Sequence, residues 1–254
     1  MTKPETGIFL ENFNSALRML GESPGGGSLR FRSGAGAFCT GLPFAGENYA
    51  LFDPFSSYEE IRGVLDFYAV RKLPFVALQL PKLKEELALE LERRKISHRA
   101  TYLAMLIVNL PSKRGRDPLV RKVTVGTEAE KWAEATWTGF EGELPVPRAY
   151  LEFSEYLFGC PENSLFFLER EGVPLCSALL HSTERSCGLY YFATRPEARR
   201  QGLASRLMDS LREYATCCSE KMVLLATEMG AKMYEKYGFR ELLEVPVFSA
   251  SDEL

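Results

Sequence analysis

A strand followed at once by a basic turn and an amphipathic helix occupies residues 187–215. The run "CGLYYFAT" at 187–194 is rich in aromatic residues, which favours a β-strand. The next segment, "RPEARRQG", holds a proline, a glycine and three arginines. Leu203, Leu207 and Leu211 then recur every four residues, which predicts a helix with one apolar face. A strand joined to a helix by so short a turn limits the fold to mixed α/β or α+β.

The turn itself has the composition of an anion site. The first turn of a helix has unpaired backbone N–H groups and a partial positive charge. Gly202 and Ala204 leave the backbone unobstructed, and Arg199 and Arg200 add charge. A pyrophosphate would suit this position. The alternative is a solvated basic turn that caps a core helix, and under either interpretation Arg195 and Arg200 are compatible with plain surface charge.

The rest of the second half also alternates helices and strands. Spacings of three and four predict helices, and short apolar runs predict strands. Two apolar runs lie on either side of Glu171-Gly172, which predicts a hairpin over 164–182 with its turn at these two residues. The expected elements are helices at 128–140, 147–158, 203–215 and 230–237, with Gly238 as the residue after the last helix, and strands at 164–182 (hairpin), 187–194, 221–226 and 239–250.

The first half repeats part of this order. We expect a helix at 58–72, a strand at 74–80, a helix at 82–95 and a strand at 100–110. Two interpretations stay open: the halves are structural relatives, or they are two generic αβ units. The glycines within 34–41 precede no helical pattern, so they predict a turn between strands rather than a second phosphate site.

A polar stretch at 109–122 is the best candidate for a boundary. It contains two prolines, a glycine and several charges, and the net charge differs across it, being +3 over 1–119 and −6 over 120–254. We therefore predict two tandem domains, 1–119 and 120–254. The predicted fold class is α/β (α+β), with a mixed central sheet flanked by helices.

Composition excludes several classes of protein. The net charge of −3 gives no electrostatic case for nucleic acid or an anionic membrane. No apolar run approaches the roughly 18 residues of a membrane span, and the first residues lack the order of a secretory signal. The final "SDEL" resembles an ER-retrieval signal that is of no use without such an entry signal. We expect a cytoplasmic protein with reduced thiols, since its six cysteines form no CxxC pair and zinc spacing is absent.

Thirty residues after the basic turn, the helix at 230–237 ends in "MYEKYGF". The two motifs together, RxxGxA opening one helix and YxxxGF closing the next, resemble the GNAT superfamily of acyl-CoA N-acyltransferases. Arg199, Gly202 and Ala204 fill the family's pyrophosphate motif, R/Q-x-x-G-x-G/A; Ala204 stands where many members have glycine. The resemblance covers about 130 residues, and the first half looks like the degenerate GNAT-like domain of two-domain members.

The resemblance implies an acetyl-CoA site along one continuous segment. Backbone amides would bind the pyrophosphate, the end of the strand would pair with the pantetheine arm, and a strand amide would polarise the thioester carbonyl. The residues implied are Phe192, Ala193, Thr194, Arg199, Arg200, Gln201, Gly202, Leu203 and Ala204.

The resemblance also implies a general acid and a base. Tyr234 fills the tyrosine of YxxxGF and would protonate the departing CoA thiolate, although it could simply pack the helix end. Glu228 ranks first as the base for the amine. Glu169 and His181 are alternatives, and ordered water could serve instead.

The acceptor is expected to be an amine, carried by a small molecule or a peptide. The segment 138–150 with Glu141 and Glu143 would line its pocket, and acidic charge mildly favours a cationic acceptor. A homodimer is compatible with the sequence. Competing hypotheses are a non-catalytic acyl-CoA-binding sensor or scaffold, and a nucleotide-binding module, which would want a GxGxxG or GxxxxGK pattern that the sequence lacks.

Overall fold

A computed structural model describes residues 4–80, 85–110 and 115–250 of the chain. Four other segments, 1–3, 81–84, 111–114 and 251–254, fall outside this description. They include the first residues of the helix predicted at 82–95, part of the stretch at 109–122, and the terminal "SDEL". Within the described residues, no helix is both long enough and apolar enough to span a membrane.

The chain divides into two compact units that each combine distant segments. Unit 1 consists of Met1–Phe13 and Leu106–Leu224, and unit 2 of Asn14–Met105 and Leu225–Leu254. This division differs from the expected boundary between residues 119 and 120. The C-terminal segment groups with the first half because its last strand pairs antiparallel with a strand at Val76–Gln79. That the two halves are related domains stays a prediction.

Unit 1 is built on a sheet of order β10-β9-β8-β7-β6, in which β9 and β10 are parallel and the other pairs antiparallel. Its elements in chain order are β6 (Val120–Lys122), α4 (Gly126–Gly139), α5 (Arg148–Gly159), β7 (Asn163–Arg170), β8 (Val173–Ser182), β9 (Cys187–Thr194), the short 3-10 helix η2 (Pro196–Ala198), α6 (Leu203–Thr216) and β10 (Lys221–Thr227).

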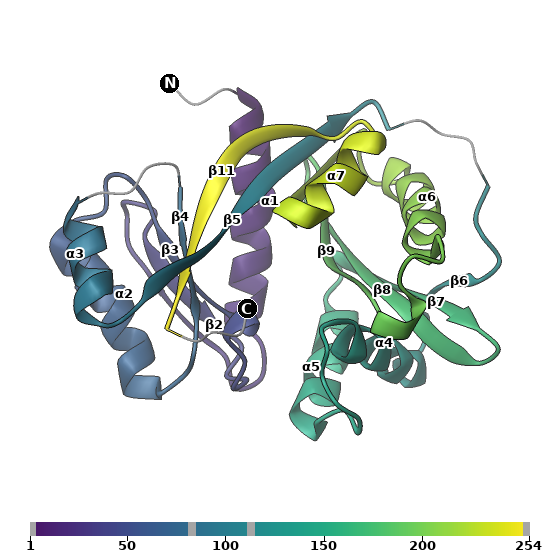
Figure 1. Cartoon of the computed structure of the whole chain (residues 1–254), viewed down its shortest axis with the longest axis horizontal. Helices are drawn as coiled ribbons and strands as arrows, with labels where there is room; N and C mark the ends of the chain where they lie inside the picture. The colour runs from purple at the N-terminus through teal and green to yellow at the C-terminus, as the bar shows by residue number, and fades with distance from the viewer. Residues whose placement is uncertain (1–3, 81–84, 111–114, 251–254) are drawn as a thin grey trace. The chain divides into compact units, whose positions relative to one another are not determined.

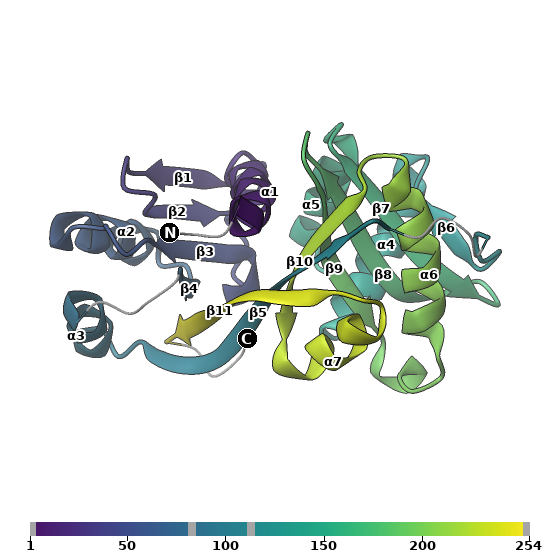
Figure 2. The same ribbon diagram turned by 90° about the horizontal axis from the view of Figure 1, so that it is seen from above.

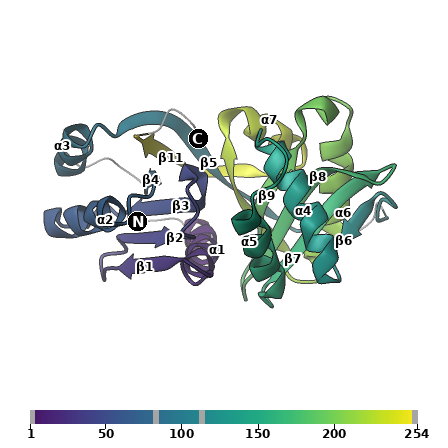
Figure 3. The same cartoon turned by 90° about the horizontal axis from the view of Figure 1, so that it is seen from below.

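Helices cover both faces of this sheet. Figure 2 shows α6 on one face, and Figure 3 shows α4 and α5 on the other. Neighbouring residues of β7 alternate accordingly, since the ring of Phe166 packs on Tyr214 of α6 while that of Phe167 faces Lys131 of α4. Both phenylalanines are fully buried. Cover on both faces explains why the central strands read as continuous apolar runs.

The first helix, α1 (Pro4–Gly21), supplies residues 4–13 to unit 1 and a buried polar contact with the sheet. Asn12 is fully buried; its Nδ2 donates to the carbonyls of His181 (3.1 Å) and Ser186 (3.2 Å). Its Oδ1 accepts from the Tyr190 hydroxyl at 2.8 Å. Each polar atom of this side chain is thereby paired, as burial requires.

In unit 2 the sheet order is β1-β2-β3-β4-β11, with β3 and β4 parallel and the other pairs antiparallel. Its described elements are β1 (Gly27–Arg30), β2 (Gly36–Cys39), the 3-10 helix η1 (Ala45–Glu47), β3 (Asn48–Phe52), α2 (Tyr58–Arg71), β4 (Val76–Gln79), α3 (Glu85–Arg93), most of β5 (Ser97–Val108), α7 (Glu228–Lys236) and β11 (Arg240–Ser249). Figure 1 labels the main elements of both units.

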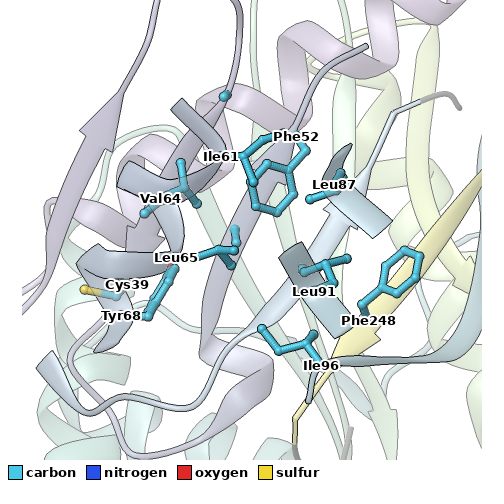
Figure 4. Close-up of a cluster of buried hydrophobic side chains, with 14 residues drawn as sticks. Cys39, Phe52, Ile61, Val64, Leu65, Tyr68, Leu87, Leu91, Ile96 and Phe248 are labelled. Atoms are coloured by element: carbon cyan, nitrogen blue, oxygen red, sulfur yellow. The ribbon is translucent and has the colours of Figure 1, made fainter. Parts of the chain in front are cut away.

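The core of unit 2 lies between this sheet and its helices. Side chains of α2 and α3, among them Leu65 and Leu91, pack with Phe52 and Phe248 (Figure 4). Ser57 caps α2 and forms a reciprocal pair with Glu60, which accounts for the sharp start of that helix. The helix–strand order expected for 58–110 is confirmed.

The predicted mixed sheet flanked by helices is confirmed, and most element positions are as expected. The hairpin turns at Glu171 and Gly172, whose φ angles of 55° and 82° are those of a type I′ turn. Gly34, with φ 103°, lies in a turn between β1 and β2, as predicted. One expectation was wrong in part: 120–122 is not linker but strand β6, because Val120 is buried opposite Leu168 of β7.

Candidate active site

The predicted strand–turn–helix segment is present in unit 1. Strand β9 ends at Thr194, a turn over residues 195–202 follows, and α6 begins at Leu203. Figure 1 shows α6 next to the strands of its unit. The turn contains η2 and ends in Gly202, which is the N-cap of α6.

The 195–202 turn has the backbone conformation of an anion-binding turn. Arg200 and Gly202 both adopt left-handed conformations, with φ of 61° and 75°. Left-handed residues in such a turn direct neighbouring N–H groups toward one concave side. Gly202 gives α6 no side-chain cap, and a Cβ built on it would meet no atom within 4 Å. Backbone amides at a helix start without a side-chain cap are suited to hold a phosphate group.

Strand β9 bends just before this turn. Its register with β8 shifts between Ser177 and Leu179, where Tyr191 has a left-handed φ of 49°. Two hydrogen bonds fix the bulge: Ser177 Oγ donates to the Tyr191 carbonyl (3.0 Å), and Trp132 Nε1 donates to the Ala178 carbonyl (2.8 Å). A bulge re-aims the strand that follows it.

The parallel pairing of β9 with β10 is short. It joins Cys187–Leu189 to Met222–Leu224. Among the described residues, the ladder does not continue to Tyr190–Thr194, the bulged part of β9. Phe192, Ala193 and Thr194, which were predicted to contact the cofactor, lie on this part of the strand.

The arginines of the turn differ sharply in environment. Arg195 is not the plain surface charge that the sequence allowed: its side chain is buried, and its Nη2 forms an ion pair with Glu134 Oε1 of α4. Arg199 Nη1 lies 2.8 Å from Glu141 Oε1, and its other nitrogens bind the Thr194 and Gly139 carbonyls. Arg200 is exposed.

The remaining predicted cofactor residues contact other parts of unit 1. Gln201 accepts a hydrogen bond from Arg170 at 3.1 Å and donates to the Glu197 carbonyl at 2.9 Å. Leu203 is buried under the start of α6, and Ala204 is half-buried beside it. These contacts fix the shape of the 195–202 turn.

Tyr234 and Glu228, the predicted acid and base, belong to unit 2. Tyr234 is 8% exposed, and burial raises the pKa of its phenol well above the ordinary value. Its ring packs edge-on against Phe239, with centroids 5.7 Å apart. Glu228 is the exposed first residue of α7, and the preceding Thr227 caps that helix by accepting from Gly230 N at 3.1 Å.

The alternative bases are engaged elsewhere. Glu169 pairs with Lys131 and with Arg121 (3.7 Å). His181 is 1% exposed; its Nδ1 lies 2.8 Å from Asn163 Oδ1, and burial lowers its pKa to about 4. Since Asn163 Nδ2 donates to the Leu157 carbonyl, its Oδ1 faces the histidine and must accept the proton of Nδ1. These contacts indicate structural roles.

The segment 138–150 was predicted to line the acceptor site, and its residues 140–147 form the loop between α4 and α5. Of its two carboxylates, Glu141 is paired with Arg199, so its charge is partly neutralised. Phe140 and Leu144 of this loop are exposed, by 62% and 55%. Sequence reasoning missed Trp132 and Gly139. Gly139 is needed because a Cβ there would lie 2.7 Å from the Cβ of Ala193.

Comparison with known proteins places this geometry in context. Residues 161–241, about a third of the chain, match the family described as "Acetyltransferase (GNAT) domain". The matched region contains the bulged strand β9, the 195–202 turn, α6 and α7. A search of curated protein sequences found no match.

Solved structures share the fold over nearly the whole chain. A GCN5-related N-acetyltransferase from Kribbella flavida superposes with a TM-score of 0.63 at 13% identity, covering 95% of each chain. Another from Sphaerobacter thermophilus gives 0.58 at 14% identity, covering 95% of this chain and 86% of that one. A GCN5-related N-acetyltransferase-like protein from Streptococcus suis gives 0.57 at 12% identity, covering 95% and 99%. At these identities the likeness concerns the fold.

Proposed function

We propose that this chain, an acyl-CoA N-acyltransferase of the GNAT superfamily by its domain and fold, moves an acetyl group from acetyl-CoA to an amine. One observation carries the proposal: the uncapped start of α6, with left-handed Arg200 and Gly202, directly follows a bulged strand. The first feature suits a pyrophosphate, and the second suits an extended amide-containing arm.

Phosphate binding would rest on the backbone. The amides of Gly202, Leu203 and Ala204 lie at the N-terminus of α6, where the helix dipole favours an anion. Arg200 would add a charged side chain, because it is exposed and next to these amides. Arg199 already binds Glu141, so its contribution to the pyrophosphate would come from its main chain.

The pantetheine arm would lie along β9. Its two amides could pair with the backbone of Phe192–Thr194, where the ladder with β10 has ended. Such pairing holds the thioester in one orientation, and orientation supplies a large share of the rate gain in acyl transfer. A strand N–H at Ala193 or Thr194 would polarise the thioester carbonyl.

The reaction we propose is direct attack. A neutral amine adds to the thioester carbonyl, the C–S bond breaks, the amine loses one proton, and the CoA thiolate gains one. Tyr234 would supply the second proton, and its raised pKa keeps the phenol protonated at neutral pH. Glu228, exposed at the start of α7, would accept the first, directly or through water. The acceptor is proposed to be a small molecule or a peptide.

A second candidate follows from the burial of Tyr234. With 8% exposure and a ring packed on Phe239, this tyrosine could serve only to close α7. The protein would then be a non-catalytic acyl-CoA-binding sensor or scaffold. Turnover separates the two candidates, since the sensor binds acetyl-CoA without releasing CoA in the presence of amines.

The first test is thermal unfolding with acetyl-CoA. A ligand at about 100 times its Kd adds roughly 2.7 kcal/mol of apparent stability. We expect this gain in the wild type and its loss in Gly202→Asp, whose carboxylate would stand at the phosphate position. Gly172→Asp is the matched control: it also has a left-handed φ, 82°, with no atom within 4 Å of its Cβ, but lies in the β7–β8 turn.

The outcomes are unambiguous. A gain that Gly172→Asp keeps and Gly202→Asp loses supports the site. The absence of any gain in the wild type at millimolar acetyl-CoA, with longer acyl-CoAs tried in parallel, would rule the proposal out. CoA release in the presence of a panel of amines, detected with a thiol reagent, then distinguishes the enzyme from the sensor.

A further inference from the structure

Arg199 occupies the first position of the pyrophosphate motif, yet its side chain points to other partners. Its Nη1 is 2.8 Å from Glu141 Oε1, its Nη2 is 3.1 Å from the Gly139 carbonyl, and its Nε is 3.2 Å from the Thr194 carbonyl. One guanidinium thus joins the end of β9, the end of α4 and the loop at 140–147. All three of its nitrogens are used within the protein.

We infer that Arg199 is a positioning residue that couples the phosphate-binding turn to the α4–α5 loop, rather than a side-chain ligand of the phosphates. The inference rests on the proposed function, because the turn must bind acyl-CoA for the coupling to act. When the amides of the turn engage an anion, the main chain at Arg199 is held in place, and its side chain transmits that constraint to Glu141.

Glu141 is the residue of this loop whose backbone conformation most needs support. Glu141 has a left-handed φ of 67°, a conformation that a residue with a Cβ adopts at some cost. Its own carboxylate, paired with Arg199, is well placed to stabilise it. The neighbouring bonds, Glu141 N to the Thr138 carbonyl and Gly142 N to the Trp137 carbonyl, complete the turn.

If Arg199 moves, we expect the 140–147 loop to move with it, and α4 to stay in place. The helix is fixed at Glu134, which pairs with the buried Arg195 at the other end of the same turn. It is also fixed at Gly139, which leaves no room for a Cβ against Ala193. The segment after Gly139 is therefore the part that can respond.

Trp137 is a built-in reporter for this loop. Its Nε1 donates to the Glu143 carbonyl at 2.7 Å, and a Cβ on Gly142 would lie 2.4 Å from its ring. The chain has two tryptophans, and the other, Trp132, is fully buried against β8. Protein labelled with 5-fluorotryptophan should give two fluorine resonances, which Trp137→Phe would assign.

The experiment records fluorine NMR spectra and thermal unfolding with and without acetyl-CoA. We expect acetyl-CoA to shift the Trp137 resonance in the wild type. In Glu141→Gln, whose amide cannot form the ion pair, the shift should fall by at least half while the thermal gain is kept. Glu143→Gln, in the same loop but without a bond to Arg199, should behave as the wild type.

Two results would overturn the coupling. One is a Trp137 resonance whose chemical shift does not change in the wild type although acetyl-CoA raises the unfolding temperature. The other is a full shift in Glu141→Gln. A wild type that shows no thermal gain would instead overturn the proposed function, and with it the coupling to acyl-CoA.

Hydrogen exchange on the free protein judges the Arg199–Glu141 connection by itself. Exchange of the amides at 141–144 should accelerate about tenfold in Glu141→Gln, which is the factor that 1.4 kcal/mol of local stability represents. It should be unchanged in Glu143→Gln. Equal exchange in both variants would show that Arg199 does not hold the loop, whether or not acetyl-CoA binds.

Discussion

The guanidinium of Arg195 is buried against Glu134, which lies 61 residues earlier in the chain. The arginine side chain is 8% exposed and the glutamate side chain 36%. Arg195 also lies 3.8 Å from Glu197, and its Nε is buried with no hydrogen-bond partner among the described residues. The pair joins the turn before α6 to helix α4.

We predict that Glu134→Ala destabilises the protein by about 2 kcal/mol, since it leaves the buried cation paired with the more exposed Glu197 at 3.8 Å. Arg195→Met, which keeps the bulk of the side chain and removes the charge, should cost less. Urea unfolding of both variants tests the order. Arg195→Met as the more destabilising change would contradict this prediction. It would mean that the ion pair stabilises the protein by more than the desolvation of the Arg195 charge costs.

Gly188 and Asn12 form a contact that tolerates no added atom. A Cβ on Gly188 would lie 2.0 Å from Asn12 Oδ1 and 2.5 Å from the Tyr190 ring. We expect Gly188→Ala to destabilise by about 3 kcal/mol, because it overpacks the site and disturbs the buried bonds of Asn12. Thermal or urea unfolding would measure the loss.

A matched control exists in the same unit. Gly159, at the end of α5, has open space around its Cβ position and no left-handed φ. Gly159→Ala should therefore change stability by less than about 0.5 kcal/mol. Similar losses in the two variants would mean that the Asn12 contact does not limit position 188.

His181 should make the protein less stable as the pH falls from about 6.5 to about 4. Burial lowers its pKa in the folded chain to about 4 from an ordinary 6.5, with Glu162 opposing the shift. Between these values the unfolded chain takes up a proton that the folded chain does not. The stability present above pH 6.5 is thus lost toward pH 4, by up to roughly 3 kcal/mol.

His181→Gln isolates this contribution. A glutamine amide can still donate to Asn163 Oδ1, which accepts from the imidazole at 2.8 Å, but it does not titrate. We expect the difference in unfolding free energy between wild type and variant to narrow as the pH falls from 6.5 to 4. If the difference in unfolding free energy stayed constant over this range, His181 would take up its proton as readily in the folded protein as in the unfolded chain, contrary to the prediction.

Much of unit 1 could be predicted because each element carries its own local signal. The aromatic run at 187–194 became β9 with those bounds, and the leucines at four-residue spacing became α6. Helix α1 was missed although Phe9, Phe13 and Leu17 repeat every four residues and are buried. Its apolar face could have been read from the sequence.

Contacts between distant residues could not be predicted in the same way. The bulge at Tyr191 has no glycine to mark it and depends on Trp132 and Ser177, which lie in other elements. Arg199 matched a phosphate motif, but its side-chain partner Glu141 lies 58 residues away. A motif predicts the backbone conformation of a turn, whereas the partners of its side chains depend on the tertiary fold.

Tyr234 tests whether the site is catalytic. If it protonates the CoA thiolate, Tyr234→Phe should lower kcat by about 100-fold, since general acid catalysis contributes roughly that much or more. The thermal gain with acetyl-CoA should remain, because the phenol oxygen is not proposed to bind phosphate. Its raised pKa further predicts that wild-type activity does not decline between pH 9 and 10 through ionisation of this phenol.

Tyr237→Phe is the matched control, three residues along the chain and at the C-cap of α7. It removes the same hydroxyl from a less buried tyrosine and should leave kcat within about twofold, so that only loss of the Tyr234 hydroxyl is costly. CoA release, followed with an amine that the wild type accepts, provides the measurement. Full activity in Tyr234→Phe would assign the ring to packing against Phe239, with which it already makes an edge-on contact, and would leave protonation of the thiolate to solvent.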